Sequence, residues 1–149
     1  MNEFFQMLKK DHKTVAGILT QLEKTEDGSK KREELFQKLK EELVPHMKAE
    51  EIAYYPPLKE KKESRDIALE GIEEHHVSEM VFKELEMMPK GTDLWAAKLS
   101  VFKELVEHHV EEEEGPIFKA TEEVFNETKI QSIMKQFVVE KQKIKATLK

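Results

Sequence analysis

Two pairs of a histidine and a glutamate four residues apart have the spacing of metal ligands on one face of a helix. These pairs are His46 with Glu50 and His109 with Glu113. Residues four apart in an α-helix project from the same side, so each pair can bind one ion. The second pair lies in "EHHVEEEEGPIF", where a solvated acidic face would explain the glutamates but not the two adjacent histidines. The segment itself leaves open which histidine is a ligand.

An internal repeat indicates which histidines belong to the site. When the sequence is shifted along itself until His12 falls on His75, its histidines, glutamates and turn residues align: His46 with His109, Glu50 with Glu113, Glu51 with Glu114, Gly28 with Gly91 and Ser29 with Thr92. The other two histidines, His76 and His108, align with a lysine and a proline. The repeat therefore predicts His75 and His109 as ligands, rather than their neighbours.

Similar distances from the predicted turns place these residues at one depth. His12 precedes the turn at Gly28-Ser29 by nearly the same length of chain by which His46 follows it, so an antiparallel hairpin brings the two histidines level. The same relation holds for the other two histidines around Gly91-Thr92. At about 1.5 Å per residue, this level lies about 25 Å from the turns. We therefore expect four histidines and two glutamates to converge in one layer of a bundle.

Six polar side chains in one buried layer favour a metal site over a purely structural one. A single histidine on an apolar helix face is usually a hydrogen-bonded core residue. Buried polar groups without full pairing would each cost about 1–3 kcal/mol, and the sum is comparable to the stability of a small domain. A metal offsets that cost, because neutral imidazoles and carboxylates become its ligands. A bundle without metal is the less favoured alternative.

The donor set narrows the choice of metal. The chain has no cysteine, so it lacks the thiolates typical of structural zinc sites. Calcium and magnesium prefer oxygen ligands and would not recruit four imidazoles. Imidazole with carboxylate suits iron or manganese, and carboxylates on facing helices can bridge two ions. Two shared glutamates leave two histidines for each ion, so neither ion is saturated and a small ligand can bind.

Apolar spacing, together with capping residues, glycines and prolines, predicts the helices that hold this layer. Apolar residues recur at helical spacing in five segments, at about residues 2–25, 29–55, 64–89, 92–115 and 121–148. Ser29 and Thr92 are predicted caps. Pro56-Pro57 and Gly115-Pro116 are predicted stops, and Pro45 is expected to bend or split its helix. The fold class is therefore all-α: an antiparallel up-and-down four-helix bundle built from two helical-hairpin repeats, plus a C-terminal helix.

Length and composition indicate one helical domain. The 149 residues are 38% charged and 38% apolar, which suits a bundle with salt-bridged outer faces. We expect a single domain over residues 1–149, with the bundle at about 2–119 and an amphipathic helix at about 121–148. Six lysines make the exposed face of that last helix basic. It either covers the bundle or forms a dimer or docking contact, so we expect a monomer or a homodimer.

Composition also excludes several partners and locations. The N-terminus lacks a basic segment followed by an apolar run, so no signal peptide is expected. No apolar stretch approaches the roughly 20 residues of a membrane span. A net charge of −6 argues against nucleic acid as a partner. We therefore expect a cytoplasmic protein that binds neither a membrane nor a nucleic acid.

Four segments in order resemble the hemerythrin family, in the branch called hemerythrin HHE cation-binding domains. They are "KKDHKTV" around His12, "HMKAEEIAYYP" from His46, "EEHHVSEMVFKEL" around His75 and "HHVEEEEGPIF" from His108. The match spans about residues 8–119. The resemblance implies a four-helix bundle that contains two iron ions in an oxo- or hydroxo-bridged di-iron centre.

The resemblance also implies a role for each ligand. One iron would be bound by His12 and His46, the other by His75 and His109, with Glu50 and Glu113 as bridges. Oxygen-carrying hemerythrins have a fifth histidine where this chain has Glu79, and an aspartate at one bridge. Glu79 is predicted to be either a terminal carboxylate ligand or a glutamate at the edge of the bundle. As a ligand it would favour ferric iron and argue against simple reversible oxygen carriage.

Two classes of function stay open from the sequence. The first is a non-catalytic di-iron protein that handles iron, or that binds or senses a small ligand such as dioxygen, peroxide or nitric oxide. The alternative is a di-iron redox enzyme that acts on peroxide, nitric oxide or ferrous iron. Tyr54 and Tyr55, one turn beyond Glu50, are either redox-active or hydrogen-bonding groups at the site, or ordinary core residues. No separate substrate pocket is evident, which favours chemistry on small molecules.

Overall fold

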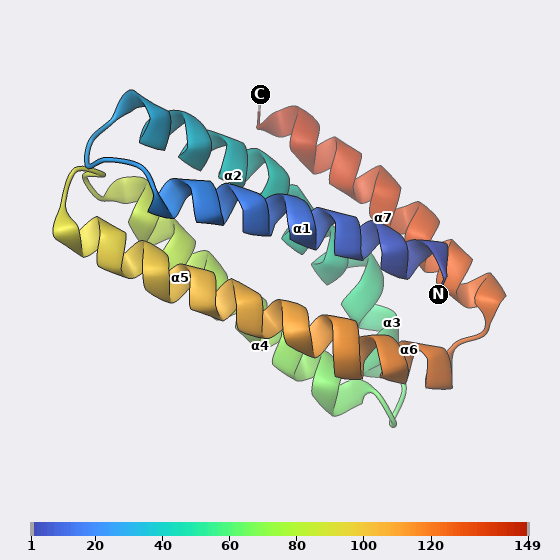
Figure 1. The fold of residues 1–149 in the computed structure, drawn as a ribbon. Helices are drawn as coiled ribbons and strands as arrows, with labels where there is room; N and C mark the ends of the chain where they lie inside the picture. Colours follow the sequence, from blue (N-terminus) through green and yellow to red (C-terminus); the bar gives the residue numbers. More distant parts are fainter. Residues whose placement is uncertain (1, 149) are drawn as a thin grey trace.

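The computed structural model describes residues 2–148, and every regular element in that range is a helix. Two antiparallel hairpins pack side by side (Figure 1), formed by α1 (Glu3–Glu23) with α2 (Lys30–Ala49) and by α4 (Arg65–Met87) with α5 (Asp93–Glu112). A further long helix, α7 (Glu127–Thr147), lies against α2. The predicted all-α bundle with a C-terminal helix is confirmed. Within residues 2–148, none of the helices has the length and apolar character needed to cross a membrane.

Two helices begin at polar capping residues, at the positions that the sequence predicts. Ser29 and Thr92 each accept a hydrogen bond, at 3.1 Å, from the backbone N–H three residues later. These bonds satisfy N–H groups that a helix start leaves without a partner. The two hairpin turns also meet: Gly28 has a φ of 67°, and a Cβ atom on Gly91 would lie 3.5 Å from the Gly28 Cα. The backbones of the two turns therefore pack closely against each other.

Two predicted helix ends are wrong. The second and fourth helices do not stop at Pro56-Pro57 and Gly115-Pro116, because each continues through a π-helix into a short α-helix. The π-helices are η1 (Glu50–Tyr54) and η2 (Glu113–Ile117), and the α-helices that follow them are α3 (Tyr55–Glu60) and α6 (Phe118–Val124). Both π-helices begin at a glutamate of the predicted site and align under the internal repeat.

The prolines are tolerated because of where they fall. Pro56 and Pro57 lie at the first positions of α3, where the fixed φ of proline suits the start of an α-helix. Pro116 lies inside η2, where the chain closes past it by a bond from the Phe118 N–H to the Glu113 carbonyl. Pro45 does not split its helix, since α2 is helical throughout.

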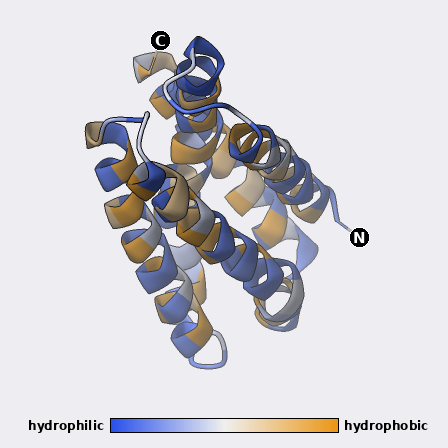
Figure 2. Cartoon of the chain, turned by 60° about the vertical axis from the view of Figure 1, so that its left-hand side comes forward, coloured by the Kyte–Doolittle hydropathy of each residue, from blue (hydrophilic) through white to orange (hydrophobic). Residues whose placement is uncertain are grey.

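Two apolar clusters divide the bundle along its length. In each of the four helical stretches of the two hairpins, with the π-helices included, residues of one cluster lie towards the hairpin turns and residues of the other lie towards the opposite end: Val15 and Leu8, Leu43 and Ala49, Phe82 and Ala68, Val106 and Ile117. Helix α7 adds Ile130, Ile133 and Phe137 to the second cluster and so covers the bundle. Figure 2 shows hydrophobic and hydrophilic residues alternating along each helix, as in amphipathic helices. The predicted ligands lie between the two clusters.

Candidate metal centre

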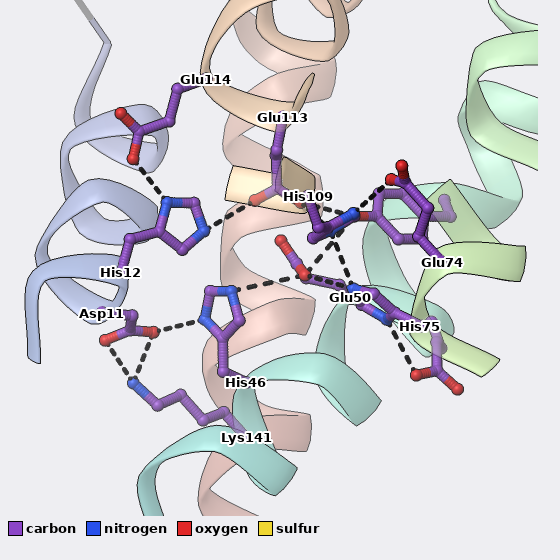
Figure 3. A network of polar contacts seen from close by, with 12 residues as sticks. Asp11, His12, His46, Glu50, Glu74, His75, His109, Glu113, Glu114 and Lys141 are labelled. Carbon is purple, nitrogen blue, oxygen red and sulfur yellow. Dashed lines mark hydrogen bonds and ion pairs between the residues drawn. The ribbon is translucent and has the colours of Figure 1, made fainter. Parts of the chain in front are cut away.

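Six buried side chains form a polar layer between the apolar clusters (Figure 3). They are the histidines and glutamates of the repeat: His12 on α1, His46 on α2, His75 on α4, His109 on α5, and Glu50 and Glu113 at the starts of η1 and η2. None of the six exposes more than 8% of its surface. The structure therefore brings these predicted ligands together at one depth, from four helices.

Two sets of ligand atoms share the glutamates. His12 and His46 form one set with Glu50 and Glu113, while His75 and His109 form the other with the same glutamates; within each set the atoms lie within 4.8 Å of one another. His46 Nε2 and His75 Nε2 lie 3.4 and 3.2 Å from the same oxygen of Glu50. His12 Nε2 and His109 Nε2 lie 3.2 and 3.3 Å from different oxygens of Glu113. The layer therefore contains two overlapping ligand sets, each of a kind that can hold a cation.

Unpaired buried atoms show that the donor set fits a cation. Within residues 2–148, four atoms of the layer are buried and form no hydrogen bond of good geometry, although the first and the last lie 3.2 Å apart: His12 Nε2, His46 Nε2, Glu50 Oε2 and Glu113 Oε1. Buried polar atoms normally have partners, and each unpaired one costs about 1–3 kcal/mol. A cation that binds their lone pairs removes this cost.

Each histidine directs its other ring nitrogen at a carboxylate on the edge of the layer. The Nδ1-to-oxygen distances are 2.6 Å for His12 and Glu114, 2.9 Å for His46 and Asp11, 2.9 Å for His75 and Glu51, and 2.7 Å for His109 and Glu74. A proton on Nδ1, donated to the carboxylate, leaves Nε2 free to bind a metal. The carboxylate also orients the ring and raises its basicity.

These four outer carboxylates were not predicted from the sequence, although the repeat contains them. Asp11 aligns with Glu74 and Glu51 aligns with Glu114, and each of the four is adjacent in sequence to a ligand. Their contacts follow the repeat as well. Asp11 and Glu74 accept from histidines of their own hairpins, whereas Glu51 and Glu114 accept from histidines of the opposite hairpin. Glu51 and Glu114 thus link the two hairpins around the layer.

Glu79, the seventh predicted ligand, lies in neither set of ligand atoms. Its Oε1 is 3.0 Å from Lys48 Nζ at the partly exposed edge of the bundle. This is the second of the two positions that the sequence leaves open for it. His76 and His108 are exposed and lie outside the layer, as the repeat predicts.

Most of the chain matches one known protein family. The family model described as Hemerythrin HHE cation binding domain matches residues 3–121. The chain belongs to this family. The crystal structure of a hemerythrin HHE cation binding domain-containing protein, the Rv2633c homolog from Mycobacterium kansasii, has a TM-score of 0.84 at 22% identity and covers 99% of this chain and 90% of that one. At this identity the likeness shows the fold alone. No curated protein matches the chain.

Tyr55 makes the two halves of the HHE site different. Its hydroxyl donates to Glu113 and lies 2.9 Å from His109 Nε2 and 3.5 Å from Glu50 Oε1. In an α-helix, the fifth residue after a glutamate would point about 140° away from it. In η1 the Tyr55 N–H bonds to the Glu50 carbonyl, and this wider turn brings both side chains to one side. The equivalent residue in the other hairpin is Phe118, which has no hydroxyl.

The two tyrosines after Glu50 divide between the predicted roles. The hydroxyl of Tyr54 lies 2.7 Å from Thr121 Oγ1, outside the layer, so Tyr54 is a hydrogen-bonded core residue. Burial, with the charge of Glu113, raises the pKa of both tyrosines well above its ordinary value. Both hydroxyls therefore keep their protons, and Tyr55 is a hydrogen-bond donor to the layer.

Carboxylates raise the pKa values of the ligand histidines. Burial alone would lower the pKa of His46, but Glu50 and Asp11 outweigh it and raise the pKa to about 10. Burial also acts to lower the pKa of His109, but Glu113 and the outer carboxylate raise it to about 10. The carboxylates therefore favour the protonated form of both rings, and a cation that binds must displace a proton from each.

A cavity of about 20 Å³ borders the layer on the side of the hairpin turns. Its lining consists of five repeat pairs: His12 and His75, Val15 and Ser78, Leu43 and Val106, His46 and His109, Met47 and Val110. The histidines and Ser78 are the polar members of this lining. A space of this size holds about one water molecule or a ligand of similar size.

Proposed function

We propose that this HHE domain holds two iron ions and binds a small ligand such as dioxygen, peroxide or nitric oxide. One observation carries the proposal: two sets of ligand atoms share Glu50 and Glu113 beside a cavity of about 20 Å³. Imidazole with carboxylate is a donor set that suits iron. Two histidines and two shared carboxylates leave each ion open to a further ligand, and the cavity is too small for an organic substrate.

The residues of the chain would bind and orient the two ions. Iron, when bound, would supply the redox chemistry. The outer carboxylates hold the Nδ1 protons, so that every Nε2 points into the layer. The aliphatic lining of the cavity, which includes Val15 and Val106, limits access of water. Ser78 is the lining residue whose hydroxyl can donate a hydrogen bond to a ligand in the cavity.

A redox enzyme that acts on peroxide, nitric oxide or ferrous iron is the second candidate, and Tyr55 favours it. Its phenol keeps a proton 2.9 Å from His109 Nε2 and donates it to Glu113. The phenol lies on the side of the layer opposite the cavity, so it can supply a proton to a reduced ligand only through the layer, by way of Glu113. Reversible binding of a ligand does not require a proton donor of this kind.

Metal analysis combined with optical spectra tests the proposal. Protein loaded with ferrous iron under anaerobic conditions and then desalted should retain about two tightly bound irons per chain, as the doubled donor set requires. Its spectrum should change on exposure to air, peroxide or nitric oxide. A single tightly bound zinc ion, with no second site after reconstitution with iron, would refute the proposal. Repeated turnover of peroxide that Tyr55→Phe slows would favour the enzyme over the binding protein.

A cavity-filling variant tests where the small ligand binds. Ser78→Leu should keep the iron and weaken the binding of azide or nitric oxide by about tenfold or more, a loss of about 1.4 kcal/mol. Ser100→Leu, at an exposed position of α5, is the matched control and should bind these ligands as the wild type does. Unchanged ligand binding in Ser78→Leu would place the ligand elsewhere.

A further inference from the structure

The outer carboxylates of the two hairpins differ on the side that faces away from the layer. Asp11 and Glu74 are repeat counterparts, and each accepts the Nδ1–H of one ligand histidine. Asp11 is also bound from outside by an ammonium group, because Lys141 Nζ on α7 lies 2.8 Å from both of its oxygens (Figure 3). In the first hairpin, a cation therefore sits on the outer side of this carboxylate.

Glu74 has a different set of neighbours. Among residues 2–148, no lysine or arginine forms an ion pair with it. Instead, His108 Nε2 lies 3.3 Å from Glu74 Oε2 and 3.6 Å from Glu112 Oε1. In the first hairpin the positions of His108 and Glu112 hold Pro45 and Ala49, whose side chains cannot bind a cation. The second hairpin thus has potential ligands where the first has none.

Glu74, His108 and Glu112 form a ligand set at the surface. Each offers one atom, and the three atoms lie within 4.8 Å of one another. The His108 side chain is 63% exposed, so a cation in solution can reach it. The three residues border a groove of about 380 Å³ between α4 and α5, whose lining adds Glu70 and Glu73. These acidic side chains create a negative potential that attracts cations.

We propose that Glu74, His108 and Glu112 bind a divalent transition-metal ion. The ion takes the place on Glu74 that the Lys141 ammonium takes on Asp11. One imidazole and two carboxylates, with positions left for water, are a donor set suited to Zn²⁺, Mn²⁺ or Fe²⁺. The site also accounts for His108, which lies outside the repeat and whose exposed ion pairs contribute little stability.

This peripheral ion is coupled to the buried layer through Glu74. One oxygen of Glu74 accepts the His109 Nδ1–H at 2.7 Å, while the other faces His108. A cation on the outer oxygen draws charge away from the inner hydrogen bond, which changes His109 as a ligand. Ser78 lines both the groove and the buried cavity, so the peripheral ion lies next to the layer that it can supply. This coupling rests on the proposed function, whereas the peripheral site itself does not.

A zinc titration of the full chain tests the peripheral site. Calorimetry on iron-loaded protein should show one Zn²⁺ bound in addition to the iron, and His108→Ala should weaken that binding by about tenfold or more. His108→Lys should abolish it, because the new ammonium can pair with Glu74 as Lys141 pairs with Asp11. Glu112→Gln should weaken it as well. Zinc should also shift the optical spectrum of the iron centre in the wild type but not in His108→Lys.

Two matched controls make the result specific. His76→Ala removes the other histidine outside the repeat, and Glu111→Gln removes an exposed glutamate beside Glu112; both should bind zinc as the wild type does. The difference in zinc content between the wild type and His108→Ala counts the peripheral ion whatever the buried layer holds. Equal zinc binding in these two proteins overturns the peripheral site. A lack of iron in every variant, with that difference intact, overturns the di-iron proposal and leaves the peripheral site standing.

Discussion

The two hairpins supply the same ligands and outer carboxylates to the buried layer, but they differ in the groups that surround it. Inside, every ligand and every outer carboxylate has a counterpart at the aligned position of the other hairpin. Outside, helix α7 lies against the first hairpin, with Lys141 on Asp11 and Phe137 against the ring of His46. The second hairpin has an open acidic groove between α4 and α5 in the corresponding place.

This difference shows which parts of the repeat the chemistry constrains. A shared pair of carboxylates requires matching donors from both sides, so substitutions there would leave buried charges unpaired. Groups outside the layer are under no such restriction. Tyr55 opposite Phe118 and Ser78 opposite Val15 are the places where one side of the layer gains a polar group. We expect metal content to depend on the equal positions, which are the ligands and outer carboxylates that align under the repeat. We expect function to depend on the unequal positions, such as Tyr55 and Ser78, where the two hairpins differ.

The largest effect is expected at the equal positions. His46→Ala and its counterpart His109→Ala should each lose at least one of the two ions, because each removes one of only four imidazoles in the layer. His76→Ala and His108→Ala should keep both ions of the buried layer. Metal analysis after reconstitution with ferrous iron and desalting decides this. Loss of buried iron in His108→Ala but not in His109→Ala would show that the repeat identifies the wrong histidine as the ligand.

A strong pH dependence of the metal-free protein should arise equally from both hairpins. His46 and His109 each have a pKa raised from 6.5 to about 10 in the folded chain. Their contribution to the free energy of unfolding is therefore complete below about pH 6.5 and is lost as the pH rises through about 10. The slope should approach at most about 1.4 kcal/mol per pH unit for each ring.

Urea denaturation of the metal-free protein between about pH 6 and pH 10 measures this slope. His46→Gln and His109→Gln should each remove a similar share of it. A slope that only one of the two variants reduces would break the equivalence of the hairpins inside the layer.

The sequence predicts the equal positions well, because an internal repeat supplies the comparison that a single site lacks. His12, His46 and their counterparts recur in the same order and at matching distances from Gly28 and Gly91, and this fixes the fold and the depth of the layer. The structure confirms the helical bundle and brings these residues together. The outer carboxylates could have been found in the same way, since Asp11 and Glu74 also align.

The roles of the unequal positions could not be decided from the sequence, because they depend on geometry that local pattern does not encode. Prolines ordinarily end helices, so the continuation through η1 and η2 is visible only in the structure. The approach of Tyr55 to Glu113 depends on the wider π-helical turn, which spacing rules for α-helices miss. The place of α7, and with it the contact of Lys141 with Asp11, follows from packing between segments far apart in the chain.

Replacing Tyr55 by the residue type of its counterpart should produce the next largest effect. Tyr55→Phe removes a buried hydrogen bond to Glu113, so the free energy of unfolding of the metal-free protein should fall by about 1–3 kcal/mol. Tyr54→Phe is the control, because it loses a buried bond to Thr121 of the same kind. Both variants should lose stability, but only Tyr55→Phe should change the optical spectrum of the iron-loaded protein. Equal spectra would show that the phenol has no influence on the layer.

The smallest effect is expected at Glu79, where the first hairpin has Ala16. Glu79 pairs with Lys48 at 3.0 Å, and its side chain is 23% exposed. An ion pair of this kind contributes about 0–1 kcal/mol. Glu79→Ala should therefore keep both irons, the wild-type spectrum and the wild-type rate of autoxidation.

Glu79→His, which supplies the fifth histidine of the oxygen carriers, should also behave as the wild type does, because the side chain lies in neither set of ligand atoms. Faster autoxidation in Glu79→Ala, or a raised reduction potential in Glu79→His, would instead make this carboxylate a ligand. The second hairpin would then supply a ligand that the first does not.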